Sequence, residues 1–535
     1  MNLQTSRATR GMVVAPHRLA AEAGLGVLRD GGNAVEAMVA AAAVIAVVYP
    51  HMNGLGGDNF WLISEGGQAP VGIDACGAAA GLASREYYRE LGHTRAVPAR
   101  GPQAALTMAG AVSGWMAALE RARGWGPALP LSRLLADALC YARDGFAVSA
   151  TQAHNTRDKR AELQTRPGFA QTFLPEGAVP TPGSRLRLEP LARTLDQLAR
   201  EGLDDFYRGA LARSMAQDLE AVGSPLRIAD FERHRALAVT PLQVSLRAGT
   251  VYGMPPPTQG LASLMILGIY DRLGIDEAEG FAHIHGLVEA TKRAFLVRDS
   301  EVTDPAYMKG DPARHLSPEA LDAQARQIDP QRALAWPRPS AQGDTVWLGA
   351  IDGQGRAVSF IQSIYWEFGS GVVLPGSGIT WQNRGTSFSL EAGHLNALEP
   401  RRRPFHTIQP ALAVLNDGRV MPFGTMGGEG QPQTKAAVFT RHVLYGQDLQ
   451  QAVSAPRWVL GRTWGSTVNR LRMEGRFDPA LVAQLRAAGH DIEVVGDYAE
   501  MMGHAGALVL HRRGPQEGII EGAADPRSDG AAAGY

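Results

Sequence analysis

The chain has 535 residues and a mass of 57.0 kDa, enough for two ordinary domains or for one large intertwined domain. With 45% hydrophobic and 20% charged residues, it has the composition of a globular protein. The net charge of −1 lacks the basic bias of proteins that neutralise many phosphates, so no nucleic-acid partner is expected. The only cysteines, Cys76 and Cys140, exclude a disulfide framework and a multi-cysteine metal site, and they suit a reducing compartment such as the cytoplasm.

The first part of the chain predicts buried helices and no membrane segment. Residues 1–10 contain no apolar core, so no secretory signal is expected there. Apolar residues at helical spacing predict a helix over 17–28. Asn33 is expected to cap a second helix over 34–48. This helix contains most of the longest apolar run, residues 37–49, which is too short to span a bilayer, so no membrane partner is expected.

The remaining elements follow from local patterns. The glycine-rich stretch 51–59 fits neither a P-loop nor a dinucleotide fingerprint, and it is interpreted as a turn before a strand over 60–63. Residues 311–343 are polar, contain five prolines and show no sustained pattern, which predicts a mobile, exposed connection. Further helices are expected at 102–123, 131–144, 191–221, 261–273, 283–297 and 434–444, and further strands at 242–246, 249–252 and 411–415.

A β-hairpin is predicted directly after this connection. Strand-forming residues cover 345–351 and 357–365, and the stretch Asp352 to Gly355 between them has turn chemistry. Thr345 stands at the start of the first strand. Taken alone, a threonine at a strand start is an ordinary β-branched residue. A cut before it, however, would make Thr345 a new amino terminus.

The motifs of several hydrolase classes are absent. The sequence contains no Gly-x-Ser-x-Gly elbow and no His-Glu-x-x-His, so neither a common serine hydrolase nor a zinc site is predicted. What remains is a nucleophile made by cutting the chain. An amino-terminal Thr345 could use its own α-amino group as the base, because that group has a pKa of about 7.7–8.0. Gly427 and Gly428, at a tight turn ahead of a helix, could direct N–H groups toward the oxyanion.

A family resemblance covers almost the whole chain. Several motifs resemble those of gamma-glutamyltransferases, members of the N-terminal-nucleophile hydrolase superfamily. They are Gly11 to Ala15, Leu28 to Ala34, Asn53 to Gly57, His285 to Ala294, Ala524 to Arg527 and Ala532 to Tyr535. The run Gly424 to Gln433 is similar to the branch that includes gamma-glutamyltransferase-like hydrolases and oxamate amidohydrolase.

The resemblance implies an α+β fold, a four-layer αββα sandwich, that needs no cofactor or metal. It also implies a proenzyme that cuts itself between Asp344 and Thr345. The products would be a large chain, residues 1–344, and a small chain, residues 345–535, which stay together as a heterodimer; a dimer of heterodimers is left open. In the cut, the Thr345 hydroxyl would attack the Asp344 carbonyl, and water would release the resulting ester.

The same resemblance assigns site residues by position. It implies that Thr345 is the nucleophile and that the Ser363 hydroxyl, where the family has a threonine, contacts the new amino group. Gly427 and Gly428 match the pair that forms the oxyanion hole.

Residues that recognise glutamate in the family are different in this chain. Cys76 occupies the place of an arginine that grips the glutamyl α-carboxylate, and cysteine cannot replace that charge-assisted pair. We interpret Cys76 as a small apolar packing residue. There are further departures from the family pattern. Tyr365 replaces an asparagine, Arg384 replaces a glutamine, Ser387 replaces an aspartate, and the pair His406-Thr407 replaces a pair of serines.

These departures favour the hydrolysis of a small amide other than a glutathione-type gamma-glutamyl compound. Arg384 and His406 are expected to hold an acidic, oxamate-like substrate, with Tyr365 and Thr407 also in the binding site. Two alternatives remain. One is a true gamma-glutamyltransferase or glutathione hydrolase with relocated binding groups, and the other is a non-catalytic, uncleaved relative that acts by binding. Whether water or an amine takes the acyl group is left open.

Overall fold

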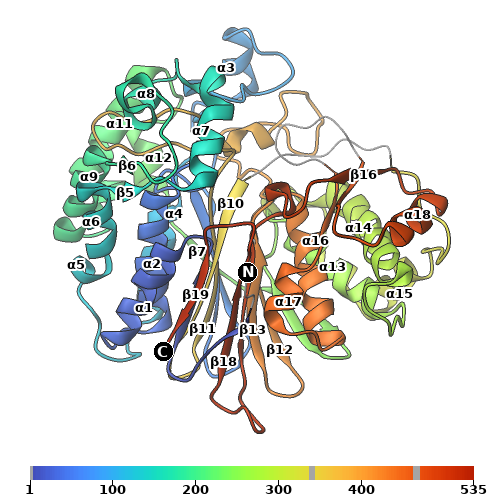
Figure 1. Cartoon of the computed structure of the whole chain (residues 1–535). Helices are drawn as coiled ribbons and strands as arrows, with labels where there is room; N and C mark the ends of the chain where they lie inside the picture. The colour runs from blue at the N-terminus through green and yellow to red at the C-terminus, as the bar shows by residue number, and fades with distance from the viewer. Residues whose placement is uncertain (1–3, 337–343, 462–469) are drawn as a thin grey trace.

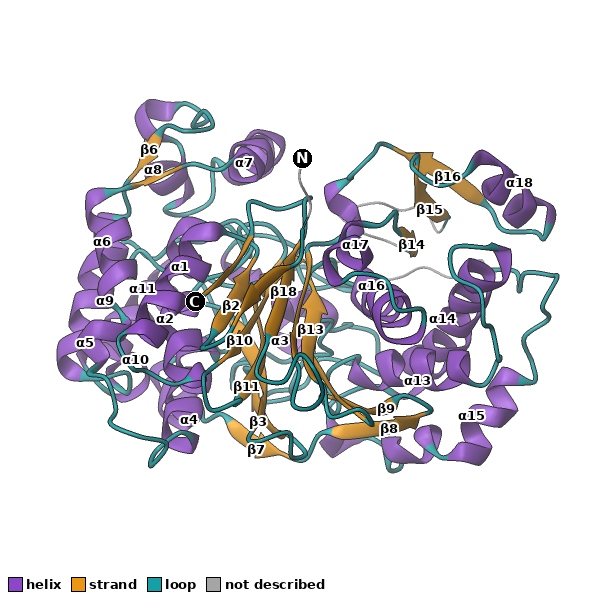
Figure 2. Cartoon of the chain, turned by 60° about the horizontal axis from the view of Figure 1, so that its bottom comes forward, coloured by secondary structure: helices purple, strands orange, loops and turns teal. Residues whose placement is uncertain are grey.

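The structure, a computed structural model, describes residues 4–336, 344–461 and 470–535. Two seven-stranded sheets lie face to face, and each is covered by helices on its outer side (Figure 1). Turned by 60°, the molecule shows the strands between a helix group that contains α1 and α2 and another that contains α13 and α16 (Figure 2). The predicted α+β fold, a four-layer αββα sandwich, is thus confirmed.

Neighbouring strands are antiparallel throughout both sheets. The first sheet has the order β19 (Ala531–Gly534), β2 (Met12–Ala15), β10 (Asp344–Ile351), β11 (Ala357–Tyr365), β3 (Asp58–Ser64), β4 (Val71–Ala75) and β7 (Leu237–Val239). The second has the order β1 (Ser6–Ala8), β18 (Ile520–Ala524), β17 (Ala505–Leu510), β13 (Val420–Thr425), β12 (Ala411–Leu415), β9 (Gly249–Gly253) and β8 (Leu242–Leu246).

Helices form the two outer layers. The main ones on the side of the first sheet are α1 (Arg18–Arg29), α2 (Ala34–Val48), α4 (Ala111–Arg121), α6 (Ala136–Asp144), α7 (Ala150–Leu163), α9 (Glu189–Glu201) and α11 (Ala210–Val222). Those on the side of the second are α13 (Gly260–Asp271), α14 (Phe281–Glu301), α15 (Pro318–Ala325), α16 (Gly430–Phe439), α17 (Leu449–Ser454) and α18 (Pro479–Ala487). Among the described residues, none of the helices is both long and apolar enough to span a bilayer.

Helix α2 is buried along its whole length. The Asn33 side chain accepts hydrogen bonds from the N–H groups of Val35 and Glu36, and the Glu36 side chain accepts one from Asn33 N–H. This capping box satisfies donors that the first turn would otherwise leave unpaired. The predicted helix over 34–48 and its cap are confirmed.

The hairpin of β10 and β11 is also confirmed, although β10 starts one residue earlier, at Asp344. Its turn is attached to the helical layer through the Asp352 carboxylate. Oδ1 accepts from the N–H groups of Gln354 and Arg356, and Oδ2 accepts from Ala34 N–H at 3.1 Å. One buried side chain therefore shapes the turn and helps to satisfy the amino terminus of α2.

Trp347 of β10 fills the space between the sheets. Its indole N–H donates to Ser359 Oγ at 3.0 Å. A Cβ atom at Gly424 of β13 would lie 2.1 Å from the Trp347 ring, and one at Gly506 of β17 would lie 2.5 Å from it. The two glycines therefore make room for the indole, and β10 is held against β13 in the facing sheet.

The expectation for residues 311–343 was wrong over their first half. A 3₁₀ turn covers Pro312–Leu316, and α15 covers Pro318–Ala325. Ser317 caps α15 by accepting from Ala320 N–H, and Leu321 is buried against α13. Residues 337–343 of this predicted connection lie outside the described residues.

Other expected helices differ in their bounds. The helix expected over 102–123 is a 3₁₀ turn at Pro102–Ala104 followed by α4. The one expected over 191–221 is broken after α9, where Gly202 has φ of 92°, a conformation that suits glycine. The one expected over 434–444 begins earlier, at Gly430, and ends in a π-helical segment, Thr440–Leu444.

Candidate active site

The predicted site residues meet at one edge of the sandwich. In the first sheet, the start of β10, the end of β11 and the start of β3 lie together, because β11 pairs antiparallel with both neighbours. In the second sheet, the end of β13 lies beside the start of β12. The two edges are joined by His406, which precedes β12 and whose Nε2 lies 2.9 Å from Oδ2 of Asp58 at the start of β3.

Thr345 is fully buried at this edge. It lies at a β-bulge, since Asp344 pairs with Tyr365 whereas Val346 pairs with Gln362, which leaves Thr345 opposite Ser363 and Ile364. Side chains alternate along a strand, so Thr345 shares the face of Trp347 and points toward the second sheet. The neighbouring Ser363 hydroxyl accepts a hydrogen bond from Tyr365 N–H at 2.8 Å.

The end of β13 continues into the turn of Gly427 and Gly428. Their φ values of 115° and 53° lie in the region that favours glycine, and α16 begins two residues later at Gly430. The Gly427 carbonyl accepts from Gly430 N–H and the Gly428 carbonyl accepts from Gln431 N–H. Within the described parts of the chain, the N–H groups of Gly427 and Gly428 have no acceptor. Two backbone donors at a helix amino terminus are thus available to bind an anion.

A buried network outside the turn holds it in place. The Gln259 amide N–H₂ donates to the carbonyls of Gly428 at 2.8 Å and of Thr407 at 2.6 Å. Its carbonyl oxygen accepts from Arg298 on α14, and Arg298 forms an ion pair with Glu429 at 3.0 Å. The glycine turn and the segment before β12 are therefore fixed to each other by one side chain.

Arg384 is a fully buried cation in the 3₁₀ turn Arg384–Ser387. Its guanidinium stacks on the ring of Tyr365, 3.7 Å from the centroid, and Nη1 donates to Thr407 Oγ1 at 3.1 Å. Nε and Nη2 have no hydrogen-bond partner among the described residues. Burial lowers the pKa of Arg384 to about 10, so it remains protonated at neutral pH.

Asp58 belongs to the site, although no local sequence pattern selects it. Its Oδ1 accepts from Gly77 N–H, Gly110 N–H and the Gln382 amide at 3.0–3.1 Å, and its Oδ2 faces His406. Burial raises the pKa of Asp58 to about 7, against the opposing effect of the Arg384 charge. Burial also lowers the pKa of His406 well below its usual value, so this imidazole is neutral.

Cys76 lies beside this pair. Burial, with the charges of Asp58 and Asp74, raises the pKa of its thiol well above the usual value, which fits an unreactive packing residue. One ligand atom each from Asp58, Cys76 and His406 lies within 4.8 Å of the others. However, both Asp58 oxygens already face hydrogen-bond donors, and the nearby Arg384 charge would repel a cation. The arrangement therefore does not favour a metal ion.

A pocket of about 280 Å³ opens next to these buried groups. Its walls include Glu429, which follows Gly428, and Phe405, which precedes His406. They also include Tyr365 and two residues of the 3₁₀ turn that begins at Arg384, Thr386 and Ser387. Tyr365 both lines the pocket and stacks on Arg384. The Tyr365 ring therefore connects the wall of this pocket with the buried guanidinium.

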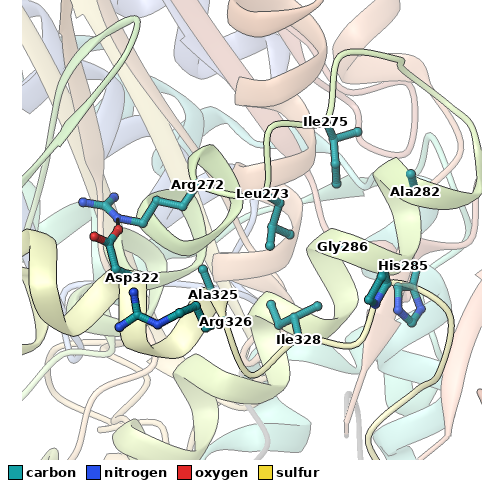
Figure 3. A pocket seen from close by; sticks show the side chains of 11 residues that line it. Arg272, Leu273, Ile275, Ala282, His285, Gly286, Asp322, Ala325, Arg326 and Ile328 are labelled. Carbon is teal, nitrogen blue, oxygen red and sulfur yellow. Dashed lines mark hydrogen bonds and ion pairs between the residues drawn. The ribbon is translucent and has the colours of Figure 1, made fainter.

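A second pocket, of about 440 Å³, lies away from the strand edge (Figure 3). Arg272 and Asp322 pair at one end of it, and His285 lies at the other. His285 is near the start of α14 whereas Arg298 is near its end, about 20 Å away at 1.5 Å per residue. His283 and His285 do not share a site; His285 Nδ1 lies 2.9 Å from Nε2 of His490 instead.

Comparisons with known proteins agree with this geometry. The sequence model of the gamma-glutamyltranspeptidase family matches residues 20–535. The oxamate amidohydrolase proenzyme of Klebsiella pneumoniae is 56% identical over 98% of this chain and 99% of its own length. The glutathione hydrolase-like YwrD proenzyme of Bacillus subtilis is 42% identical over 98% of both chains. The crystal structure of cephalosporin acylase from Bacillus halodurans superposes with a TM-score of 0.90 at 34% identity, covering 99% of this chain and 97% of its own.

Proposed function

Because this chain belongs to the gamma-glutamyltranspeptidase family and is an enzyme like its named relatives, we propose that it is a self-cleaving amidohydrolase with Thr345 as its nucleophile. The proposed cut lies between Asp344 and Thr345. It gives a large chain of residues 1–344 and a small chain of residues 345–535, which remain together as a heterodimer. The names of the two curated relatives, both proenzymes, support this processing.

The surroundings of Thr345 support each step of the proposed chemistry. After the cut, its α-amino group takes the hydroxyl proton while the oxygen attacks the amide carbonyl. The negative charge on the carbonyl oxygen is bound by the N–H groups of Gly427 and Gly428, which have no acceptor among the described residues. The amine then returns the proton to the departing ammonia, and water hydrolyses the acyl-threonine ester. Ser363 lies opposite Thr345 in β11, which supports its proposed contact with the amino group.

The Arg384 donors that have no partner in the described part of the chain are the observation that carries the substrate proposal. Nε and Nη2 lie on one side of a guanidinium fork, the geometry that binds the two oxygens of a carboxylate. A buried arginine with this side unpaired is costly unless a ligand anion completes it. We therefore assign the substrate as a small amide that carries a carboxylate, such as oxamate, with Tyr365 and Thr407 holding the guanidinium in place.

A gamma-glutamyl compound is the second candidate, and the same arginine favours it. Cys76 stands where the family has its carboxylate-binding arginine, so Arg384 could be a relocated group with that role. The glutathione hydrolase-like name of one relative agrees with this candidate. The two candidates differ in the length of the substrate between its carboxylate and its reacting amide.

Intact mass measurement with amino-terminal sequencing tests the processing. Purified protein should give two fragments that meet at Asp344/Thr345, whereas Thr345→Ala should remain a single chain because it lacks the hydroxyl that attacks the Asp344 carbonyl. The conservative variant Thr345→Ser keeps a hydroxyl at the same position, so it provides the control and should still cut. An unbroken wild-type chain after long incubation would contradict the mechanism, since no free amine would then act as base.

Substrate competition separates the two candidates. The mature enzyme should release ammonia from oxamate with a larger kcat/KM than that for release of the aniline from a gamma-glutamyl anilide. The Thr345→Ala variant should hydrolyse neither substrate. Equal or faster turnover of the anilide would favour the glutathione-type candidate. A cytoplasmic location remains a separate prediction from the cysteine content.

A further inference from the structure

His406 has one ring nitrogen that the proposed reaction has not yet used. Its Nδ1 is buried and has no hydrogen-bond partner within the described residues, whereas Nε2 faces Asp58. A buried polar atom without a partner destabilises the fold, so such atoms at a site often mark a place for a ligand. The His406 side chain links the two sheets through Asp58, and it lies near the charge of Arg384.

The hydrogen bonds around Asp58 determine which His406 nitrogen carries the proton. Asp58 Oδ1 is fully used by two backbone N–H groups and by the Gln382 amide. The orientation of that amide is fixed, because its nitrogen also donates to the Met108 carbonyl, which can only accept. Oδ2 of the ionised carboxylate is therefore left to accept from His406 Nε2–H. In a neutral imidazole the other nitrogen, Nδ1, then has a lone pair.

Arg384 and His406 thus present opposite hydrogen-bonding groups at the same site. Arg384 offers the N–H donors of two unpaired nitrogens, and His406 offers one unpaired acceptor, as far as the described residues show. The Arg384 charge is close enough to lower the pKa of His406, so the two side chains are near neighbours. An oxamate-like molecule has the matching groups, a carboxylate at one end and an amide N–H₂ at the other.

We propose that His406 Nδ1 accepts a hydrogen bond from the N–H₂ group of the substrate amide, and that Asp58 is a positioning residue that keeps this nitrogen unprotonated. This inference rests on the proposed amidohydrolase function. It replaces the expectation that His406 holds the acidic end of the substrate, because a neutral imidazole with a lone pair repels a carboxylate. The enzyme is then selective for primary amides over esters of the same acid.

Two substrates that differ only in the leaving group test this selectivity. Oxamate carries N–H₂ where monomethyl oxalate carries O–CH₃, and both keep the carboxylate for Arg384. The quantity to measure is the ratio of kcat/KM for the amide to kcat/KM for the ester, at about pH 8, where Asp58 is ionised. The ratio in each variant is compared with that of the wild type, which cancels the intrinsic reactivity of the ester.

Two substitutions at His406 separate its two nitrogens. His406→Gln keeps an N–H donor that reaches Asp58 but loses the acceptor at Nδ1, so the ratio should fall about 10- to 100-fold. His406→Asn keeps a carbonyl oxygen near the Nδ1 position and is the matched control, with a ratio within about threefold of the wild type. An unchanged ratio in His406→Gln, or an equal loss on both substrates, would overturn the inference.

Asp58→Asn tests the positioning role without changing side-chain volume. The three donors to Oδ1 keep the amide oxygen on their side, so the new N–H₂ group faces His406 Nε2 and drives the ring proton to Nδ1. The amide-to-ester ratio should fall as in His406→Gln. The ¹⁵N resonance of His406 Nδ1, assigned by its absence in His406→Gln, should change from the lone-pair to the N–H type. Retention of the lone-pair type in this variant would contradict the role of Asp58.

The outcomes also separate this inference from the proposed function. Wild-type enzyme that is cut at Thr345 and hydrolyses both substrates supports the function whatever the variants do. If it hydrolyses neither, the proposed function fails and the inference falls with it. If it hydrolyses both and the ratio is unaffected by His406→Gln, only the inference fails.

Discussion

Arg384 is a buried cation that uses only part of its hydrogen-bonding capacity. Tyr365 covers one face of the guanidinium and Thr407 accepts from Nη1, while Nε and Nη2 remain unpaired within the described residues. A protein that buries a charge usually pairs it, and the exceptions tend to be functional. The site is thus organised around a cation that is held rigidly on one side and open on the other.

We predict that Arg384→Gln lowers kcat/KM for oxamate about 100-fold or more, because two charge-assisted hydrogen bonds to the carboxylate are lost. Arg384→Lys should be intermediate, since a lysine keeps the charge but not the fork. Steady-state kinetics of ammonia release measure both effects. Oxamide, which has a neutral amide in place of the carboxylate, is the control substrate. Its kcat/KM should fall much less in both variants. An equal loss on oxamide would show that Arg384 supports the structure and does not bind the carboxylate.

The family resemblance selected Thr345, the glycine pair and Arg384 as candidate site residues, but neither it nor a local sequence pattern selected Asp58. Asp58 lies within the glycine-rich stretch 51–59, whose pattern indicates a turn, and its partner His406 is 348 residues away. Their contact depends on two strand edges from facing sheets, which no local pattern encodes. The same limit explains why His406 was assigned to the acidic end of the substrate, since its charge state follows from Asp58 and from burial.

At the scale of elements, the β10–β11 hairpin connects the sheet edge with the helical layer. One end of the hairpin holds Thr345 in a bulge, and the other end holds Asp352 against the start of α2. The sequence predicted this hairpin and α2 well, because apolar runs, a cap and a glycine turn all agreed. It missed α15 because the polar composition of 311–343 outweighed a short capping signal, Ser317 before Pro318.

We predict that Asp352→Ala lowers the free energy of unfolding by about 2–4 kcal/mol, since it removes a buried carboxylate that accepts from three backbone N–H groups. Urea unfolding of the uncut Thr345→Ala chain measures this effect. Asp417→Ala is the matched control, because exposed Asp417 forms a similar turn bond to Arg419 N–H in the β12–β13 hairpin. That change should cost less than about 1 kcal/mol. Equal effects would mean that the contact with α2 contributes nothing.

At the scale of the whole molecule, the two proposed chains share both sheets. In the first sheet, β11, β19 and all of β10 after Asp344 come from residues 345–535, and β2, β3, β4 and β7 come from residues 1–344. In the second sheet, β1, β8 and β9 come from the large chain and the other strands from the small chain. Neither chain therefore contains a complete sheet or a complete core.

We predict that the precursor refolds from denaturant and that the cut enzyme does not do so efficiently. The recovered fraction of the Thr345→Ala chain should be independent of protein concentration below the onset of aggregation, because its strands are joined covalently. For the cut enzyme, refolding has to bring two molecules together, so the recovered activity should fall on dilution. After dilution from urea, circular dichroism measures the refolding of the Thr345→Ala chain, and ammonia release measures the refolding of the cut enzyme. Equal, concentration-independent recovery would contradict the shared-sheet argument.

The carboxyl terminus adds one more link between the two proposed chains. The Tyr535 main-chain oxygen accepts from the N–H groups of Thr9 and Arg10, and its hydroxyl donates to the Leu28 carbonyl. Strand β19, just before it, pairs with β2. After the proposed cut, we expect that such links can be broken but not readily rebuilt. The working life of the mature enzyme is then set by how slowly it opens, and a cell can replace lost molecules only by synthesising new precursor.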